Sequence, residues 1–250
     1  MRIKVFGERN TATNAVEQLI QNNSHSYISP GTEHGLNTTL VAISKNLRRV
    51  RMPRAVSEAV LDNIFRDVAP DRQWKHTATY FPSVESLAYF HVIFTVRHPL
   101  SWLLSFHRNP YHALNRRPDD FLEFYKKTWP TLARDRLCKL ALRPLELLEA
   151  KIESYFFLAE KLDTMGISYS FVRQEDLVMN QREVFEKIKP WLDAPNDTFS
   201  ELRQSTKHRV DIEFYRRYYG DEQWRASIPS EIKENYVFCR RIMSRFDYAF

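Results

Sequence analysis

Short apolar runs alternate with segments of helical periodicity along this chain. Ile3–Phe6 is apolar apart from Lys4 and is brief enough to be a strand, and Thr13–Gln21 then places its apolar residues on one face of a helix. His91–Val96 is a nearly continuous run of β-branched and aromatic residues, which is typical of a parallel strand that is covered on both faces. Pro99 follows at a position that suits the first turn of a helix.

The same patterns continue through the rest of the chain. We expect further helices at Ser57–Val68, Leu145–Leu162, Glu183–Leu192 and Ile228–Phe246, and further strands at Gln73–Phe81 and Ser168–Val172. Strands that alternate with helices predict an α/β fold with a central parallel sheet flanked by helices. Because the 250 residues contain no repeat and no evident linker, residues 1–250 are predicted to form a single domain.

The chain is basic, with a formal net charge of +6. A basic surplus favours anionic partners such as nucleotides, sulfated glycans, nucleic acid or an anionic membrane, and it does not choose among them. The densest basic run consists of Arg48, Arg49, Arg51 and Arg54. We interpret this run as a solvated face.

The two cysteines, Cys138 and Cys239, stand far apart in segments with a helical pattern. They are expected to be reduced, packed thiols of a cytoplasmic protein. The sequence shows no metal-ligand spacing and no apolar stretch of the roughly 20 residues that a membrane span needs, so neither a metal site nor a span is expected. The chain enters its first strand at once, without a signal-peptide pattern.

Two segments each have the layout of an anion site, in which a strand runs through polar residues into a helix. The first is the loop Arg9–Asn14, after the strand Ile3–Phe6, and the second is Arg97, with Ser105 one helical stretch further on. A helix N-terminus presents unpaired N–H groups and the positive end of its dipole to an anion. Two such edges predict a ligand that carries two separate phosphate groups.

This pair of segments resembles the sulfotransferase family that uses 3'-phosphoadenosine 5'-phosphosulfate (PAPS). In that family an N-terminal strand, loop and helix of the type Lys-x-Gly-Thr-x cradle the 5'-phosphosulfate, and a later Arg-x-Pro with a downstream Ser binds the 3'-phosphate. Arg97, Pro99 and Ser105 preserve the second pattern, whereas Asn10 and Ala12 stand where the family often has Lys and Gly. The resemblance continues in the second half of the chain, at Phe171–Leu177, Phe185–Ile188, Trp191–Leu192 and Phe246–Tyr248.

The resemblance implies a P-loop NTPase-like sulfotransferase fold, PAPS as the donor and adenosine 3',5'-bisphosphate as the second product. Thr13 is retained from the family loop, and the adjacent Arg9 can supply the charge that Asn10 lacks. Golgi members of the family carry a membrane anchor, so we expect a soluble microbial or viral version here. The residues that the resemblance places on the donor are Arg9, Asn10, Thr11, Ala12, Thr13, Asn14, Arg97 and Ser105.

The catalytic candidate is Trp74–Phe81, at the end of an expected strand, where open α/β sheets place their ligands. It resembles the segment that carries a His base in cytosolic sulfotransferases and a Glu base in glycan sulfotransferases. We expect His76 to be the general base, because an ordinary histidine pKa of about 6.5 suits proton removal near neutrality, and Lys75 to stabilise the leaving phosphate oxygen. The alternative places His76 on the donor and a carboxylate elsewhere as the base. Glu8 is a further candidate, although support of the loop explains it as well.

The leading hypothesis is an enzyme that transfers a sulfuryl group from PAPS to a hydroxyl of a carbohydrate or small-metabolite acceptor. Arg108–His112 is a candidate lining of the acceptor cleft, and Tyr215–Tyr218 is a candidate lid over adenine or the acceptor. A P-loop kinase-like phosphotransferase is an alternative, although no Gly-Lys-Ser/Thr follows the loop. The other alternative is a non-catalytic nucleotide- or polyanion-binding protein with a degenerate donor loop. Nucleic acid is not the expected partner.

Overall fold

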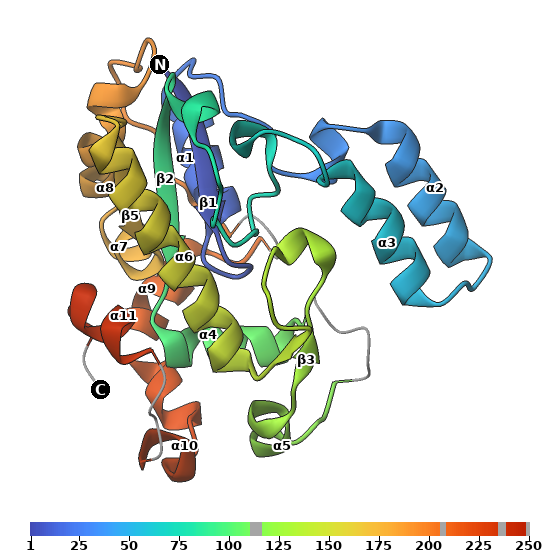
Figure 1. Ribbon diagram of the computed structural model, residues 1–250. Coiled ribbons are helices and arrows are strands. Elements are labelled where there is room, and N and C mark those ends of the chain that lie inside the picture. The colour runs from blue at the N-terminus through green and yellow to red at the C-terminus, as the bar shows by residue number, and fades with distance from the viewer. Residues whose placement is uncertain (111–116, 206–208, 235–238, 249–250) are drawn as a thin grey trace.

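The computed structural model of the protein describes residues 1–110, 117–205, 209–234 and 239–248 (Figure 1). Three parallel strands form its main sheet: β1 (Arg2–Gly7), β2 (Phe90–Val96) and β5 (Tyr169–Arg173), in the order β1-β2-β5. All seven residues of the central strand β2 are buried, as its continuous apolar run predicts. The predicted α/β class, with a parallel sheet flanked by helices, is confirmed.

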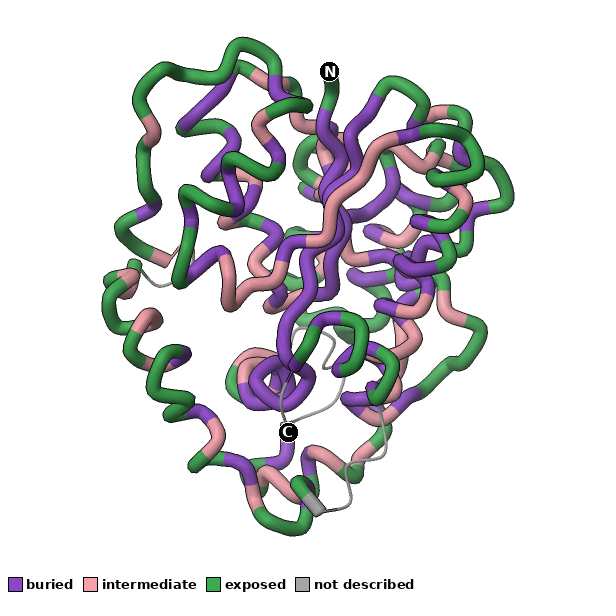
Figure 2. The backbone as a smooth tube through the Cα atoms, turned by 90° about the vertical axis from the view of Figure 1, so that its left-hand side faces the viewer, coloured by how far each residue is buried: buried purple, intermediate pink, exposed green. Residues whose placement is uncertain are grey.

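Successive residues of a strand point to opposite faces of the sheet, and here each face has its own core. Phe6 and Phe94 face the larger core, which is built with α4 (Pro99–Arg108) and α6 (Pro144–Thr164). Val5 and Ile93 face the other core, which is built with α1 (Thr13–Asn23) and α8 (Gln181–Ile188). Buried residues gather in the interior of the molecule, whereas exposed residues follow its outline (Figure 2).

A helical hairpin made of α2 (Thr38–Arg49) and α3 (Arg54–Ile64) stands to one side of the sheet (Figure 1). It has a small core of its own, which contains Val41, Leu61 and Trp74. The predicted helix at residues 57–68 corresponds to α3, whose observed bounds lie three to four residues earlier. The helix α2 was not predicted.

The remaining elements are short. The helices are α5 (Phe121–Lys126), α7 (Gln174–Met179), α9 (Ile212–Gly220), α10 (Ser230–Glu234) and α11 (Arg240–Arg245), and β3 (Trp129–Pro130) pairs with β4 (Ala141–Leu142) in a two-stranded ribbon. Single turns of 3-10 helix lie at Glu33–Gly35, Pro70–Arg72, Glu85–Leu87, Ala133–Asp135, Lys189–Trp191 and Gln223–Ser227. Across the described residues, none of the helices combines the length and apolar character that crossing a membrane requires.

The prediction of a strand at Gln73–Phe81 is wrong. The segment crosses the end of β1 and makes one backbone bond to it there, from the Gly7 N–H to the Lys75 carbonyl (2.9 Å). Its other backbone groups find partners elsewhere: Ala78 N–H donates to the Asp135 carbonyl (2.8 Å), and Thr79 N–H donates to the Ser154 hydroxyl of α6 (2.8 Å). These tertiary bonds replace a strand ladder.

The C-terminal prediction and one cysteine prediction also need correction. The expected single helix Ile228–Phe246 is not observed as such, because α10 ends at Glu234 and α11 begins at Arg240, while residues 235–238 lie outside the described part. Cys239 is buried at the start of α11, as a packed thiol should be, but Cys138 is exposed and lies outside any helix. Both cysteines are free.

Candidate functional site

The loop between β1 and α1, residues Arg9–Asn14, lies at the carboxyl end of the sheet. Asn10 and Ala12 both adopt left-handed backbone conformations, with φ of 67° and 69°. Thr11 N–H donates back to the Glu8 carbonyl (3.2 Å), and Val16 N–H donates to the Ala12 carbonyl (3.0 Å). Alternating right- and left-handed residues before a helix N-terminus turn backbone N–H groups toward one concavity, which is a common anion-binding arrangement.

Ala12 stands where the sulfotransferase loop that this segment resembles has glycine. Glycine adopts a left-handed conformation without strain, whereas alanine does so at a cost of about 1–2 kcal/mol. Because the backbone at Ala12 keeps this conformation, the loop retains a glycine-like path with an alanine side chain.

The side chain of Thr11 holds the loop against the sheet. Its buried hydroxyl donates to the Glu8 carbonyl (2.6 Å) and is 2.7 Å from the hydroxyl of Thr95 on β2. The side chain therefore faces the sheet, so it is the least suited of the predicted loop residues to hold a ligand.

Arg97 extends from the end of β2 to the same loop. Its Nη1 donates to the Asn10 carbonyl (3.0 Å), and its Nε donates to the Ser101 hydroxyl on α4 (2.8 Å). Its guanidinium also lies 5.7 Å from the ring centroid of Tyr219 on α9. Arg97 thus joins the first predicted anion segment to the second.

A pocket of about 300 Å³, the Arg97 pocket, opens on one side of the loop. It is lined by Asn10, Ala12, Ala15, Arg97, Ser105, Arg108, Asn109, Gln174, Leu177, Val178, Gln181, Leu202, Gln204, Ser205, Ile212, Tyr215, Tyr218 and Tyr219. The structure therefore brings Arg97 and Ser105 into one pocket, together with Tyr215 and Tyr218 of the predicted lid. Of the segment predicted to line the acceptor cleft, Arg108 and Asn109 lie in this pocket, whereas Tyr111 and His112 lie outside the described residues.

A second pocket of about 410 Å³, the His76 pocket, also borders the loop. It is lined by Arg9, Asn10, Ala12, Thr13, Asn14, Thr32, Glu33, Trp74, Lys75 and His76. Asn10 and Ala12 line both pockets, so the loop is a shared wall between them. The buried Nδ2 of Asn10, which carries two N–H groups, has no hydrogen-bond partner among the described residues.

A hydrogen bond determines which of the two ring nitrogens of His76 carries the proton. Its Nδ1 is 2.6 Å from the Gly7 carbonyl. A carbonyl only accepts, so Nδ1 carries the proton and Nε2 of the neutral ring carries the lone pair. Burial, together with the positive charge of Arg9, lowers the pKa of His76 well below 6.5. The ring is therefore unprotonated near neutrality, as a proton acceptor must be.

Lys75 is buried and already paired. Its Nζ donates to Glu17 Oε2 (2.6 Å) and to Asn14 Oδ1 (2.7 Å), both on α1. The ammonium therefore lies beside the first turn of α1, at the edge of the His76 pocket. A ligand phosphate would compete there with Glu17 for the same charge.

The carboxylate of Glu8 faces inward to a buried ion cluster. Lys151 Nζ on α6 lies 3.2 Å from Glu8 Oε2 and 2.6 Å from Asp135 Oδ1, and all three side chains are fully buried. Because Glu8 lines neither pocket, its position fits support of the loop better than proton removal from a ligand.

Arg9 is a further loop residue that lines the His76 pocket. Its guanidinium lies 4.8 Å from the ring centroid of Trp74, and its carbonyl accepts a bond from Trp102 Nε1 (2.7 Å). Burial lowers the pKa of Arg9, and the nearby charge of Arg134 adds to that effect. The side chain still lines the His76 pocket, where an anion would offset both costs.

Several lining residues of the Arg97 pocket were missed by the sequence reasoning. Gln174 and Leu177 come from α7, Gln181 from α8 and Tyr219 from α9. Only Gln174 and Leu177 had any signal, because they belong to a segment that carries the family resemblance.

No protein-family model matches the chain, and no curated protein matches it either. Within the described part of the chain, no group of three or more His, Cys, Asp or Glu side chains is arranged to hold a metal ion. The case for a function therefore depends on the geometry of the two pockets and on the residues that line them.

Proposed function

We propose that this protein is a PAPS-dependent sulfotransferase with a sulfotransferase-type P-loop fold. The observation that carries the proposal is the shared wall: Asn10 and Ala12 of the Arg9–Asn14 loop line both a pocket that contains Arg97 and Ser105 and a pocket that contains His76. A donor with a 3'-phosphate at one end and a reactive phosphosulfate at the other needs two such compartments that share one anion-binding loop.

The donor fits the residues present. Arg97 and Ser105 would hold the 3'-phosphate, with the aromatic side chains of Tyr215 and Tyr218 beside the nucleoside. Loop N–H groups, the unpartnered Nδ2 of Asn10 and the charge of Arg9 would hold the phosphosulfate. These groups are mostly preorganised, so binding costs little rearrangement.

The chemistry of the proposed reaction is a displacement at sulfur. The bound donor supplies an activated sulfuryl group, and adenosine 3',5'-bisphosphate leaves. His76 Nε2 takes the proton of the acceptor hydroxyl as the hydroxyl oxygen forms its bond to sulfur and the bond from sulfur to the phosphate oxygen breaks. Lys75, at the edge of the same pocket, is positioned to stabilise the departing oxygen once it exchanges part of its contact with Glu17.

The acceptor belongs to the same proposal. It carries a hydroxyl group and is a carbohydrate or a small metabolite, which enters the His76 pocket past Thr32 and Glu33. The carboxylate of Glu33 suits hydrogen bonding to sugar hydroxyls. We also propose a cytoplasmic location, since both cysteines are free.

The first test is calorimetric titration with adenosine 3',5'-bisphosphate at low salt. We expect the unmodified protein to bind, and Arg97→Ala to bind roughly 10- to 100-fold more weakly, because a hydrogen bond to a charged group contributes about 1.5–3 kcal/mol. Ser105→Ala should also weaken binding, and it leaves the Arg97–Asn10 contact intact. Arg240→Ala is the matched control, because Arg240 is exposed on α11 and does not line the pocket.

Other outcomes would assign the site differently. Absence of binding to the unmodified protein overturns the sulfotransferase proposal. Magnesium-dependent binding of ATP would favour a kinase-like phosphotransferase. Steeply salt-dependent binding of polyanions, without affinity for the nucleotide, would favour a non-catalytic binding protein.

A further inference from the structure

The helical hairpin Thr38–Ile64 has an unusual charge pattern. From His34 to Ser57 the chain contains no Asp or Glu, and it contains five basic residues: Lys45, Arg48, Arg49, Arg51 and Arg54. Four of these basic residues lie within the seven positions 48–54, which comprise the last two residues of α2, the four-residue connection and the first residue of α3. The end of the hairpin therefore concentrates positive charge without carboxylates of its own.

The same end exposes aliphatic side chains. Every residue from 48 to 56 is exposed, and Val50 and Met52 have exposed fractions of 69% and 43%. Figure 1 shows that this connection lies at the far end of α2 and α3, away from the main sheet. Apolar side chains at a projecting apex, with arginines on both sides, form a surface that is both basic and apolar.

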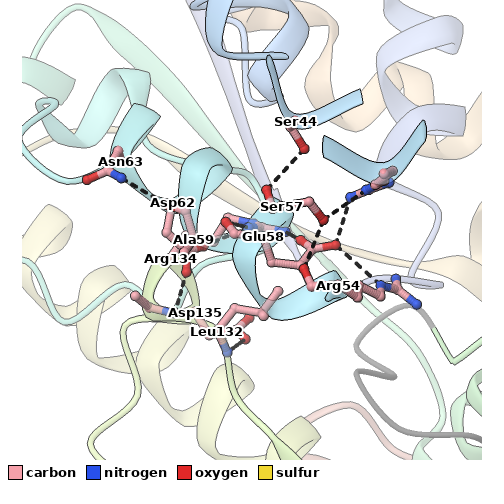
Figure 3. A network of polar contacts seen from close by, with 12 residues as sticks. Ser44, Arg54, Ser57, Glu58, Ala59, Asp62, Asn63, Leu132, Arg134 and Asp135 are labelled. Carbon is pink, nitrogen blue, oxygen red and sulfur yellow. Dashed lines mark hydrogen bonds and ion pairs between the residues drawn. The ribbon is translucent and has the colours of Figure 1, made fainter. Parts of the chain in front are cut away.

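The hairpin is attached to the body through α3, whereas residues 48–56 at its end remain exposed. Arg134, in the loop that precedes β4, forms ion pairs with Glu58 (2.5 Å) and Asp62 (2.6 Å) on α3 (Figure 3). Ser44 on α2 donates to the Ser57 carbonyl (3.0 Å), which holds the two helices together (Figure 3).

The arginines of the hairpin divide into two groups. Arg48 and Arg54 pair with Glu58, at 2.8 and 3.4 Å. Arg49 and Arg51 form no ion pair with any carboxylate in the described part of the chain, and the same holds for Lys45. The first group stabilises the hairpin, whereas the second presents uncompensated charge.

We propose that the hairpin end, residues 48–54, binds the surface of a membrane that contains anionic lipids. The unpaired basic side chains would contact lipid headgroups, and Val50 and Met52 would enter the boundary between headgroups and acyl chains. The apolar apex favours this partner over nucleic acid or a sulfated glycan, because a purely polyanionic partner gives exposed aliphatic side chains nothing to contact. The proposal does not depend on the sulfotransferase function.

Cosedimentation with lipid vesicles tests this surface directly. The full-length protein should sediment with vesicles of phosphatidylcholine and phosphatidylserine and should stay in solution with phosphatidylcholine alone. Arg49→Gln with Arg51→Gln should lower the partition coefficient about 30-fold, since each basic residue near an anionic surface contributes about 1 kcal/mol. Val50→Ser with Met52→Ser should lower it as well.

The matched control is Lys139→Gln with Leu140→Ser, an exposed basic and apolar pair on the body of the protein, where Leu140 is 86% exposed. This variant should sediment like the unmodified protein. Equal loss in the control variant would overturn the proposal. So would retention of binding by the Val50 and Met52 variant combined with loss by the arginine variant, because that result shows attraction by charge alone, without insertion of the apolar side chains. Failure of the unmodified protein to bind the anionic vesicles would also overturn it.

Discussion

At the scale of single residues, the site depends on groups whose ionisation the fold controls. The bond from His76 Nδ1 to the Gly7 carbonyl fixes the tautomer, and burial keeps the ring unprotonated. Lys75 has its charge matched by Glu17, and Glu8 has its charge matched by Lys151. His76 is therefore the best placed of the three candidates to accept a proton from a ligand.

The pH dependence of catalysis follows from this arrangement. Because the pKa of His76 in the free protein lies well below 6.5, kcat/KM should stay level from pH 8 to pH 6.5 and should fall only below that range. Bound donor phosphates raise the pKa of a nearby imidazole, so the fall in kcat should begin at a higher pH than the fall in kcat/KM. Steady-state rates across this pH range provide the measurement.

Two variants at position 76 separate proton transfer from support of the loop. In His76→Asn the amide can still donate to the Gly7 carbonyl but offers no proton acceptor equivalent to Nε2. His76→Ala loses both the bond to Gly7 and the proton acceptor. We expect both variants to lower kcat by about 10²–10⁴ while they still bind adenosine 3',5'-bisphosphate. Full activity of the asparagine variant would show that another group is the base.

At the scale of elements, the connection from β1 to α1 sets the shape of the site. Three contacts hold the loop in place. The Thr11 hydroxyl bonds to Thr95 on β2, the Arg97 guanidinium bonds to the Asn10 carbonyl, and Gly7 at the start of the loop packs closely against β2. An added Cβ at Gly7 would lie 1.9 Å from the Thr95 hydroxyl oxygen and 2.8 Å from that of Thr11. The strand end and the loop are therefore packed as one unit.

Gly7→Ala and Ala12→Gly should have opposite effects on this unit. Gly7→Ala should lower the free energy of unfolding by about 1–3 kcal/mol, as overpacking does, and should also abolish nucleotide binding. Ala12→Gly removes the strain of an alanine in a left-handed conformation but makes the unfolded chain more flexible, and the two effects oppose each other. The free energy of unfolding should therefore change by less than about 1 kcal/mol, and nucleotide binding should persist. Urea unfolding with parallel calorimetry measures both. Equal damage from the two substitutions would contradict this account of the loop.

At the scale of the whole molecule, a buried ion cluster connects the parts that form the site. Lys151 on α6 contacts Glu8 after β1, Asp135 in the loop before β4, and the carbonyl of His76. Its ammonium also lies 5.4 Å from the ring centroid of Trp74, which belongs to the hairpin core. One lysine thus holds together segments that are far apart in the sequence.

Lys151→Met should therefore be costly for stability. The substitution removes the ammonium that the buried carboxylates of Glu8 and Asp135 share, and breaking a buried ion pair in this way typically costs about 3–5 kcal/mol. Lys161→Met is the matched control on the same helix, because Lys161 contacts the neutral carbonyl of Phe81 (2.7 Å) and its loss should cost about 1 kcal/mol. Chemical denaturation at neutral pH compares the two. A loss in Lys151→Met no larger than in the control would show that the cluster contributes little.

Local sequence patterns alone determined the strands of the sheet, the helices α1, α4 and α6, and the placement of the Arg9–Asn14 loop and Arg97 at strand ends. The physical reason is that burial periodicity and helix starts are local properties of the chain. The same reasoning correctly gave β2 as the buried strand, because a continuous apolar run is stable only between two covering layers.

Only the tertiary structure decided the rest. Gln73–Phe81 has the composition of a strand, yet its backbone groups bond to Asp135 and Ser154, which no local pattern can reveal. The inward direction of Thr11, the pairing of Lys75 with Glu17 and the contribution of α7, α8 and α9 to the Arg97 pocket likewise depend on contacts between distant segments. Sequence reasoning named many residues of the candidate site, and long-range packing decided which groups those side chains contact.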